Sequence, residues 1–445
     1  MKRYLTLILA GLVVLLAVVL LGVLVFLKSQ PVAERAFPTL VQIASMEPDS
    51  DRWGLNFPNE YSTFLKTEGN NIDTAYGGSS KFSWLKRDPR QLILFAGYPF
   101  SKDYNDDRGH MNALTDVSNT GRLNLNPADP KHTPATCYSC KSSNNPALWT
   151  EMGMAAFDKT SFADMTPRIQ ETIGCADCHE AGTMRLIVTN PALNEALAAQ
   201  GEDWKTFTRQ EMRTVVCGNC HVEYYFQGDG KYLTFPWANG RDIDSMVAYY
   251  TQNAFKDWDY PGTGTPMLKA QHPEFETFTA NSTHYLAGVA CADCHMPYVR
   301  EGAAKYSSHD IKSPLLNADL ACGQCHTDTE YVVGRVKIIQ DQHAAAKTAA
   351  EDALIDAINA LTSAAAAPNA DASLLDQARQ FHRKAQFMWD FVSAENSMGF
   401  HNPDYSMRIL ADSTNFARQA QMLAARAAND MDLLQTGTYY SQTSQ

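Results

Sequence analysis

Ten cysteines form five pairs with the same spacing, and these pairs are the part of the chain best suited to chemistry. Four pairs are followed directly by histidine, in the stretches Cys175-Ala-Asp-Cys178-His179, Cys217-Gly-Asn-Cys220-His221, Cys291-Ala-Asp-Cys294-His295 and Cys322-Gly-Gln-Cys325-His326. The C-x-x-C-H pattern attaches c-type haem, because two thioethers hold the porphyrin and the histidine ligates iron. The fifth pair, Cys137 and Cys140, is followed by Lys141, which marks one haem as chemically different.

Zinc and redox dithiols are the alternative uses of such cysteines. A zinc ribbon pairs two C-x-x-C units without needing the trailing histidine, and a thioredoxin-like dithiol needs only one unit beside a βαβ pattern. With 12 histidines in 445 residues, four of five pairs would gain a following histidine by chance in roughly one of several hundred thousand cases. We therefore predict five covalently bound c-type haems.

Lys141 poses a separate question. A lysine binds iron only as the neutral amine, so its ordinary pKa of about 10.4 must be overridden, which a nearby bound cation can do just as zinc acidifies its water. The alternative is that Lys141 merely follows a haem ligated from elsewhere. If Lys141 is the proximal ligand, the opposite face of that haem is available for substrate.

Eight further histidines are candidates for the second axial positions: His110, His132, His272, His284, His309, His343, His382 and His401. Electron-transfer haems usually have a second strong axial ligand, so four six-coordinate haems would use four of them. Residue type alone leaves the assignment open.

The N-terminus carries a long apolar run. Between Tyr4 and Leu27 there is no charge, and 18 of 24 residues are Leu, Val, Ile or Phe. This length suffices to span a bilayer, and no small-x-small cleavage site follows it. We therefore predict a transmembrane anchor, or an uncleaved signal, in residues 1–30. Lys2 and Arg3 would keep the N-terminus inside, leaving the catalytic domain on the periplasmic or outer face of the cell membrane.

Charge limits the possible partners. The formal net charge is -12 and no basic stripe appears, which excludes nucleic acid. An anionic substrate would need local positive charge that outweighs this net field.

Domain organisation follows from composition. We predict a pentahaem catalytic domain in residues 31–328 and a long-helix region in 329–445. An alanine-rich helix is expected from about Glu330 to Ala365, a second after the break at Pro368 with Ser373 as its cap, and a third from near Pro403. These helices are expected to pack on the haem core or on a second subunit. The fold class predicted is mainly α with little β-structure.

Two further stretches join the cysteine motifs: Cys220-His221-Val-Glu223-Tyr224-Tyr225-Phe226 and Lys269-Ala-Gln271-His272-Pro273-Glu274. Together with one C-x-x-C-K and four C-x-x-C-H motifs, they resemble the pentahaem cytochrome c nitrite reductase family, the ammonia-forming enzymes, from about Trp53 to the third C-terminal helix. The resemblance implies a multihaem cytochrome c fold. It also implies six-electron reduction of nitrite to ammonium at a lysine-ligated haem fed by four bis-histidine haems. The alternatives are an electron-transfer cytochrome and a reductase acting mainly on sulfite or hydroxylamine.

Carried over residue by residue, the resemblance makes Lys141 the proximal ligand of the catalytic haem. It places Arg122, Tyr224 and His272 in the distal pocket, with Arg108 as the local competitor of Arg122 because the spacing differs by about one residue. It also implies one Ca²⁺, bound by the Glu223 carboxylate, the Gln271 side-chain oxygen and the backbone carbonyls of Tyr224 and Lys269. Oxygen donors of this kind suit a hard cation.

The same resemblance implies the remaining axial ligands. His309 would serve the second-motif haem, His110 the third, His401 the fourth and His284 the fifth, which leaves His132, His343 and His382 as surface or packing residues. It further implies a homodimer through the long C-terminal helices and a membrane quinol-oxidising cytochrome as electron donor.

Overall fold

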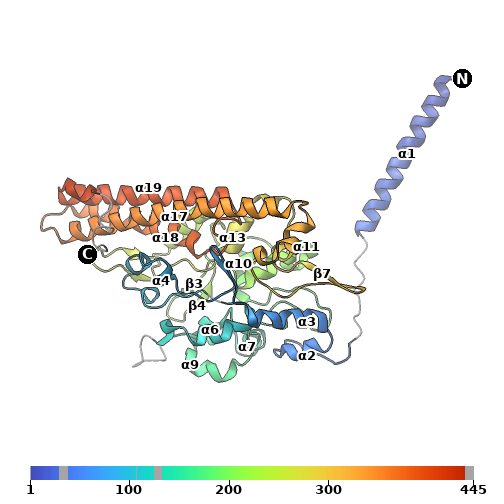
Figure 1. Cartoon of the computed structure of the whole chain (residues 1–445), viewed down its shortest axis with the longest axis horizontal. Coiled ribbons are helices and arrows are strands. Elements are labelled where there is room, and N and C mark those ends of the chain that lie inside the picture. The colour runs from blue at the N-terminus through green and yellow to red at the C-terminus, as the bar shows by residue number, and fades with distance from the viewer. Residues whose placement is uncertain (1, 30–38, 107, 125–132, 436–445) are drawn as a thin grey trace. The chain divides into compact units, whose positions relative to one another are not determined.

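The computed structural model describes residues 2–29, 39–106, 108–124 and 133–435 (Figure 1). The chain divides into two units, Met1–Thr39 and Leu40–Gln445. The first unit contains one helix, α1 (Lys2–Ser29), and the second contains all the cysteine motifs.

The prediction of a transmembrane anchor in residues 1–30 is wrong by the criteria of length and apolarity. A membrane-spanning helix needs about 20 consecutive, predominantly apolar residues. Among the helices in the described part of the chain, none combines enough length with enough apolarity to cross a membrane. The cell-membrane location that we predicted from this anchor is therefore wrong as well.

Short helices dominate the second unit as far as residue 328. They are α2 (Ser50–Gly54), α3 (Pro58–Phe64), α4 (Trp84–Arg87), α5 (Gln91–Leu94), α6 (Ala113–Ser118), α7 (Asn145–Met152), α8 (Met154–Lys159), α9 (Phe162–Met165), α10 (Pro191–Ala199), α11 (Arg209–Val215), α12 (Ile243–Gln252), α13 (Glu274–Thr279), α14 (Thr283–Leu286), α15 (Cys291–His295) and α16 (Ala318–Ala321). Short 3₁₀ segments join many of them.

The strands of the described residues form only two-stranded antiparallel hairpins. They pair as β1 (Asp73–Thr74) with β2 (Gly77–Gly78), β3 (Tyr225–Gln227) with β4 (Tyr232–Thr234), β5 (Trp258–Asp259) with β6 (Pro266–Met267), and β7 (Tyr298–Glu301) with β8 (Ala304–Ser307). In register, Phe226 lies opposite Leu233 and Trp258 opposite Met267. The predicted mainly α fold with little β-structure is confirmed.

Each cysteine motif forms a tight helical turn. The amide of the histidine after the second cysteine donates to the carbonyl of the first, as for His179 to Cys175 and His221 to Cys217, both at 2.9 Å. Such a turn brings residues three and four apart to the same side, so both sulfurs and the imidazole can reach one porphyrin. The fifth motif differs, because the Lys141 amide donates to Tyr138 O at 2.9 Å, three residues back instead of four.

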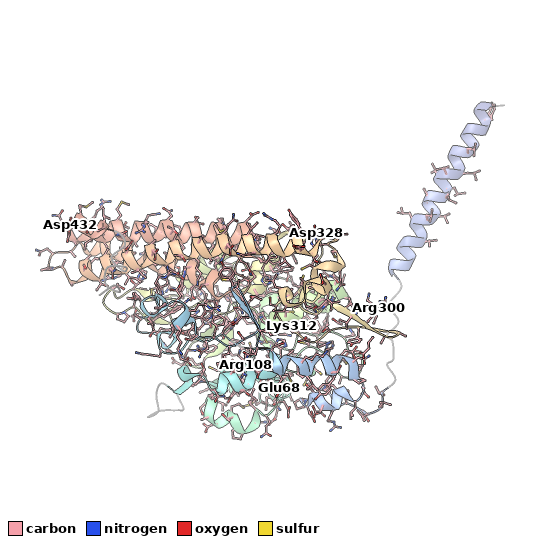
Figure 2. The ribbon with its side chains drawn as sticks, viewed as in Figure 1. Glu68, Arg108, Arg300, Lys312, Asp328 and Asp432 are labelled. Atoms are coloured by element: carbon pink, nitrogen blue, oxygen red, sulfur yellow. The ribbon has the colours of Figure 1, made fainter. Side chains whose placement is uncertain are left out.

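Three long helices, α17 (Thr329–Ala366), α18 (Ala372–Ala394) and α19 (Pro403–Ala428), lie side by side along one edge of the second unit (Figure 1). Asp328, which caps α17, and Asp432, beyond α19, lie at opposite ends of this bundle (Figure 2). The predicted helices are present, but the cap of α18 is Asp371, whose side chain accepts from the amides of Ser373 and Leu374. Ser373 therefore lies inside the first turn.

The bundle packs directly on the preceding part of the second unit, residues 40–328, which carries the cysteine motifs and is called the haem-motif region below. From α18, Gln386 Nε2 donates to Leu94 O at 2.6 Å and Arg383 Nη1 to Pro266 O at 2.7 Å. From α17, Glu351 pairs with Arg90 at 2.7 Å. The helices are thus part of the scaffold around the motifs, and dimerisation through them stays a prediction.

One buried carboxyl group next to the fifth motif should make folding depend on pH. Asp158 is fully buried, and one of its oxygens accepts from Leu233 N at 2.8 Å while the other has no hydrogen-bond partner among the described residues. Burial raises the pKa of Asp158 to about 7. Between its unfolded pKa near 4 and about 7, the folded protein therefore holds one more proton than the unfolded chain, so rising pH destabilises it.

We expect the free energy of unfolding of the wild type to fall by about 2–3 kcal/mol more than that of Asp158→Asn between pH 5 and pH 8. Denaturant titration of the haem-loaded proteins at both pH values measures this difference. Asp229→Asn, an exposed position in the turn between β3 and β4, is the control. Equal pH dependence in Asp158→Asn and wild type would contradict the prediction.

Candidate functional site

Each histidine of the four C-x-x-C-H motifs faces a second histidine from a distant part of the chain. Their ring centroids are separated by 6.2 Å for His179 and His309, 6.4 Å for His221 and His110, 6.2 Å for His295 and His401, and 6.5 Å for His326 and His284. Two imidazoles that bind one metal ion from opposite sides, through bonds of about 2 Å, have centroids roughly 6 Å apart. The described residues therefore fit one iron between the rings of each pair.

Hydrogen bonds at Nδ1 orient several of these rings. His179 Nδ1 lies 2.9 Å from Met184 O, His309 Nδ1 2.9 Å from Ser307 O, and His295 Nδ1 3.2 Å from Lys312 O. A ring that donates from Nδ1 to a carbonyl presents Nε2 as the metal-binding nitrogen. Burial also lowers the pKa of His179 and His295 to about 4, which keeps these rings in the neutral, metal-binding form.

The structure thus brings together the same four pairs that the resemblance implies, and their role as iron ligands stays a prediction. Four histidines belong to none of these pairs, and one of them, His272, has its ring centroid 6.4 Å from that of His221, the same separation as for His110. His343 on α17 and His382 on α18 are buried in the bundle, and His382 contacts Thr265 and Gln386 by hydrogen bonds. His132 lies outside the described residues.

The two candidate arginines differ in their hydrogen-bond partners, because one binds a carboxylate and the other a main-chain carbonyl. Arg108 (Figure 2) donates two hydrogen bonds to the buried Asp116 carboxylate, from Nη2 at 2.7 Å and from Nε at 3.1 Å. Arg122, in the 3₁₀ segment Gly121–Asn124, donates from Nη1 to Asp103 O at 2.8 Å, and its guanidinium lies 4.1 Å from the centre of the Phe100 ring. Within the described part of the chain Arg122 forms no ion pair with a carboxylate, so its charge is available to an anion.

Tyr224 and Lys141 share this neighbourhood. Burial raises the pKa of Tyr224 well above its usual value, charge at Cys140 and Cys137 raises it further, and Arg122 lowers it. Burial likewise raises the pKa of Cys137 to about 12, against the opposing charges of Arg122 and Lys141. Arg122 and Tyr224 therefore lie near the cysteines of the motif that ends in Lys141.

Glu274 links His272 to one of the paired histidines. Its Oε1 lies 3.9 Å from His272 Nδ1, and its Oε2 lies 3.7 Å from His221 Nδ1. Burial acts to raise the pKa of Glu274, but the two histidines outweigh it and hold that pKa below its ordinary value. The His272 side chain is 40% exposed, so solvent and a small anion can reach it.

The groups predicted to bind a cation lie together. Glu223 is fully buried; its Oε1 accepts from Tyr250 OH at 2.9 Å and its Oε2 from Gln271 N at 2.7 Å. Gln271 Nε2 donates to Lys269 O at 3.3 Å, so the amide nitrogen, and not the oxygen predicted to bind the cation, faces this carbonyl. Burial raises the pKa of Glu223 well above its ordinary value, while its bonds from Gln271 N and Tyr250 OH and the charge of Lys269 lower it.

This donor set fits a hard cation only if main-chain oxygens take part. Among the described residues, no cluster of three or more His, Cys, Asp or Glu side chains could hold a metal ion by itself. Ca²⁺ accepts backbone and amide carbonyls as readily as carboxylates. One carboxylate, one amide and two carbonyls therefore remain a chemically suitable set, and calcium binding stays a prediction.

Residues outside the quoted motifs complete the site. Phe100 and Asp103 hold Arg122, Tyr250 and Asp257 lie behind the cation donors, and Asp390 reaches the same place from α18. Sequence reasoning missed them because no local pattern marks them. Glu274 had a signal, since it ends the quoted stretch that contains His272.

Comparisons with known proteins show which chains this one is similar to. A family model described as cytochrome c552 matches residues 49–439. A cytochrome c-552 from Parabacteroides distasonis is 40% identical over 392 residues, covering 86% of this chain and 78% of that protein. A cytochrome c nitrite reductase subunit from Nitratidesulfovibrio vulgaris is 39% identical over 406 residues, covering 83% and 77%. The solved catalytic subunit of cytochrome c nitrite reductase from Desulfovibrio desulfuricans, described as having two calcium sites, matches with a TM-score of 0.83 and 36% identity over 87% of this chain and 88% of that one.

Removing one paired histidine should change one haem and leave the rest. We expect His309→Ala to convert a single low-spin haem into a high-spin one, because the ring facing His179 is lost. Electron paramagnetic resonance of the oxidised protein measures the spin states. His382→Gln, a buried position that faces no motif histidine, should leave the spectrum unchanged, and an unchanged spectrum in His309→Ala would contradict the pairing.

Proposed function

This chain belongs to the cytochrome c552 family, and we propose that it reduces nitrite to ammonium with six electrons, as an ammonia-forming cytochrome c nitrite reductase. One observation carries the proposal most directly. Four histidine pairs are spaced for six-coordinate iron, whereas the fifth motif ends in Lys141 and has the pocket residues Arg122 and Tyr224 beside it. A pure electron carrier would have no use for such an asymmetric fifth site.

We propose five c-type haems, one at each cysteine pair. When bound, haem iron supplies reversible one-electron chemistry and an open coordination position for a small ligand. Lys141 would hold the catalytic haem as its proximal ligand. The four histidine pairs would hold the other haems with both axial positions filled, which suits them to passing electrons.

The pocket side chains bind and orient the anion in this proposal. Arg122 would contact nitrite oxygen through donors that its bond to Asp103 does not use, while the Phe100 ring keeps its guanidinium in place. His272, with Glu274 beside Nδ1, would hold and move a proton at Nε2. The Tyr224 hydroxyl, whose pKa burial keeps high, would stay protonated and donate a hydrogen bond.

We also propose one Ca²⁺ at Glu223, Tyr224, Lys269 and Gln271. The fully buried Glu223 carboxylate, next to the Lys269 and Gln271 main chain, supports a divalent cation there. Its charge would add to that of Arg122 and oppose the net charge of -12 that an approaching anion meets. The relative with two calcium sites supports this assignment by analogy.

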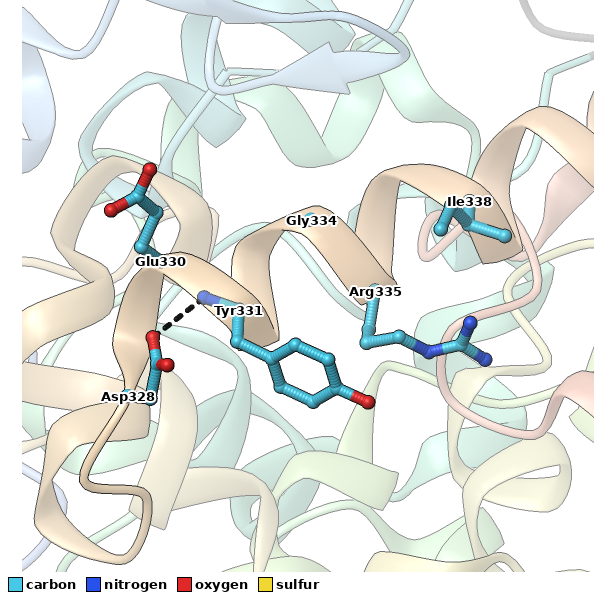
Figure 3. Close-up of a pocket in the computed structure, with 6 residues that line it drawn as sticks. All are labelled: Asp328, Glu330, Tyr331, Gly334, Arg335 and Ile338. Carbon is cyan, nitrogen blue, oxygen red and sulfur yellow. Dashed lines mark hydrogen bonds between the residues drawn. The ribbon is translucent and has the colours of Figure 1, made fainter.

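A homodimer through the long helices is part of the proposal. The helices expose large apolar side chains, including Tyr331 at 65% and Ile338 at 44% on α17 and Met422 at 45% on α19. Figure 3 shows Tyr331 and Arg335 projecting from the first turns of α17, just after the Asp328 cap. Aromatic residues, methionine and arginine are enriched in protein interfaces. The proposed electron donor is a membrane quinol-oxidising cytochrome.

Product stoichiometry tests the proposed reaction. Anaerobic incubation of the haem-loaded protein with a reduced viologen dye and nitrite should yield ammonium at about six electrons per molecule, without release of nitric oxide or hydroxylamine. Dye that stays reduced while the haems remain redox-active would point instead to an electron-transfer cytochrome. Faster turnover of sulfite or hydroxylamine than of nitrite, compared as kcat/KM, would point to a different reductase.

Exchanging each candidate arginine separates a substrate contact from a structural ion pair. We expect Arg122→Gln to lower kcat/KM for nitrite about 10–100-fold, because a charged hydrogen bond to the anion is lost. Arg108→Gln is the matched control and should lower stability but leave kcat/KM within about twofold, since Arg108 is bound to Asp116. Steady-state kinetics on both variants decides, and a larger loss in Arg108→Gln would reverse the assignment.

A further inference from the structure

Three consecutive amides in the segment before His272 donate to three different carboxylates. Lys269 N donates to Asp257 Oδ2 at 2.9 Å, Ala270 N to Asp390 Oδ2 at 2.8 Å, and Gln271 N to Glu223 Oε2 at 2.7 Å. The carboxylates come from the turn before β5, from α18 and from the stretch before β3. A segment held at every amide by a separate acceptor has little freedom to move.

Asp390 contributes twice to this arrangement. Its other oxygen, Oδ1, accepts from Lys269 Nζ at 2.9 Å, and both side chains are 1% exposed. The Lys269 Nζ also lies 4.8 Å from the centre of the Phe100 ring, on which Arg122 packs.

A buried ion pair of this kind adds little stability in general, because desolvation of both charges offsets their attraction. Its position suggests another role. The amide of Ala270 and the carbonyl of Lys269 belong to one planar trans peptide group, so they point in opposite directions. By accepting from Ala270 N, Asp390 directs the Lys269 carbonyl away from α18 and toward Gln271, whose Nε2 donates to that oxygen at 3.3 Å.

We propose that Asp390 is a positioning residue of the cation site. It fixes the direction of the Lys269 carbonyl and the placement of Gln271, and through them the approach of His272. The inference rests on the proposed function for the identity of the cation. It assigns to α18 a part in the site, in addition to packing.

The local charge agrees with this role. Glu223, Asp257 and Asp390 place three carboxylates around the segment, and Lys269 supplies the one ammonium that pairs with them directly among the described residues. The excess of negative charge suits a divalent cation that takes carbonyl oxygens. Neutralising Asp390 changes both charge and orientation, so a variant that keeps the charge is needed beside it.

Calcium affinity of the haem-loaded protein is the primary readout. We expect Asp390→Asn to bind Ca²⁺ about 10–100-fold more weakly in isothermal titration after removal of calcium with a chelator, because residues behind metal ligands have effects of this size. In this variant the new side-chain oxygen would accept from the Lys269 ammonium, and Ala270 N would lose its acceptor. The double variant Lys269→Met/Asp390→Asn frees that oxygen for Ala270 N, and affinity should return to within about threefold of wild type.

Glu351→Gln is the matched control. Glu351 is a fully buried carboxylate in the same bundle, paired with Lys347 at 3.3 Å and contacted by Trp389, yet it makes no hydrogen bond to residues 269–272. It should lower stability and leave calcium affinity unchanged. If Asp390→Asn does not load haem, Asp390→Glu keeps the charge beside Lys269, moves the carboxylate, and should weaken Ca²⁺ binding about tenfold.

Several outcomes would overturn the inference. These are wild-type affinity in Asp390→Asn, an equal loss of affinity in Glu351→Gln, failure of the double variant to recover, or a wild type that binds no calcium. A wild type that binds calcium but makes no ammonium would refute the proposed function, while the titrations would still decide the role of Asp390.

Discussion

The structure depends on one constraint: four pairs of imidazole rings must face each other with their centroids 6.2 to 6.5 Å apart. One ring of each pair stands on the tight turn of a cysteine motif, where main-chain hydrogen bonds fix it locally. The opposing ring comes from a segment elsewhere in the second unit. The short helices and hairpins serve to bring these second segments into place, and this explains why so little regular structure is found outside the C-terminal bundle.

The fifth motif departs from this pattern in its main chain as well as in its residue type. The Lys141 amide bonds three residues back, whereas the motif histidines bond four residues back. Among the described residues, its neighbourhood has an arginine held against Phe100 and a tyrosine whose pKa burial raises. Membership in the cytochrome c552 family accounts for the shared framework, and the proposed catalysis is assigned to the one motif that differs.

Hydrogen bonds connect the long helix α18 to the candidate site. Gln386, Asp390 and Arg383 on α18 all bond main-chain atoms of the haem-motif region. Asp390 belongs to a bundle that composition describes only as alanine-rich and amphipathic. A carboxylate buried at 1% exposure beside one ammonium is costly to desolvate, and the positional task proposed for Asp390 offsets no part of that cost by stability alone.

Residue order by itself determined the cysteine motifs, the odd lysine, the long helices and the family, because spacing along the chain is a local property and each motif folds as one turn. It misjudged residues 1–30, where a run of apolar residues was taken as sufficient for a membrane span, and it placed the cap of α18 two residues late. Only the tertiary structure decided that Arg108 is bound to Asp116 while Arg122 is not, that Glu274 joins two histidines, and that Asp390 holds a peptide 120 residues away. Contacts of that kind depend on how distant segments pack around buried charge, and no pattern in neighbouring residues records them.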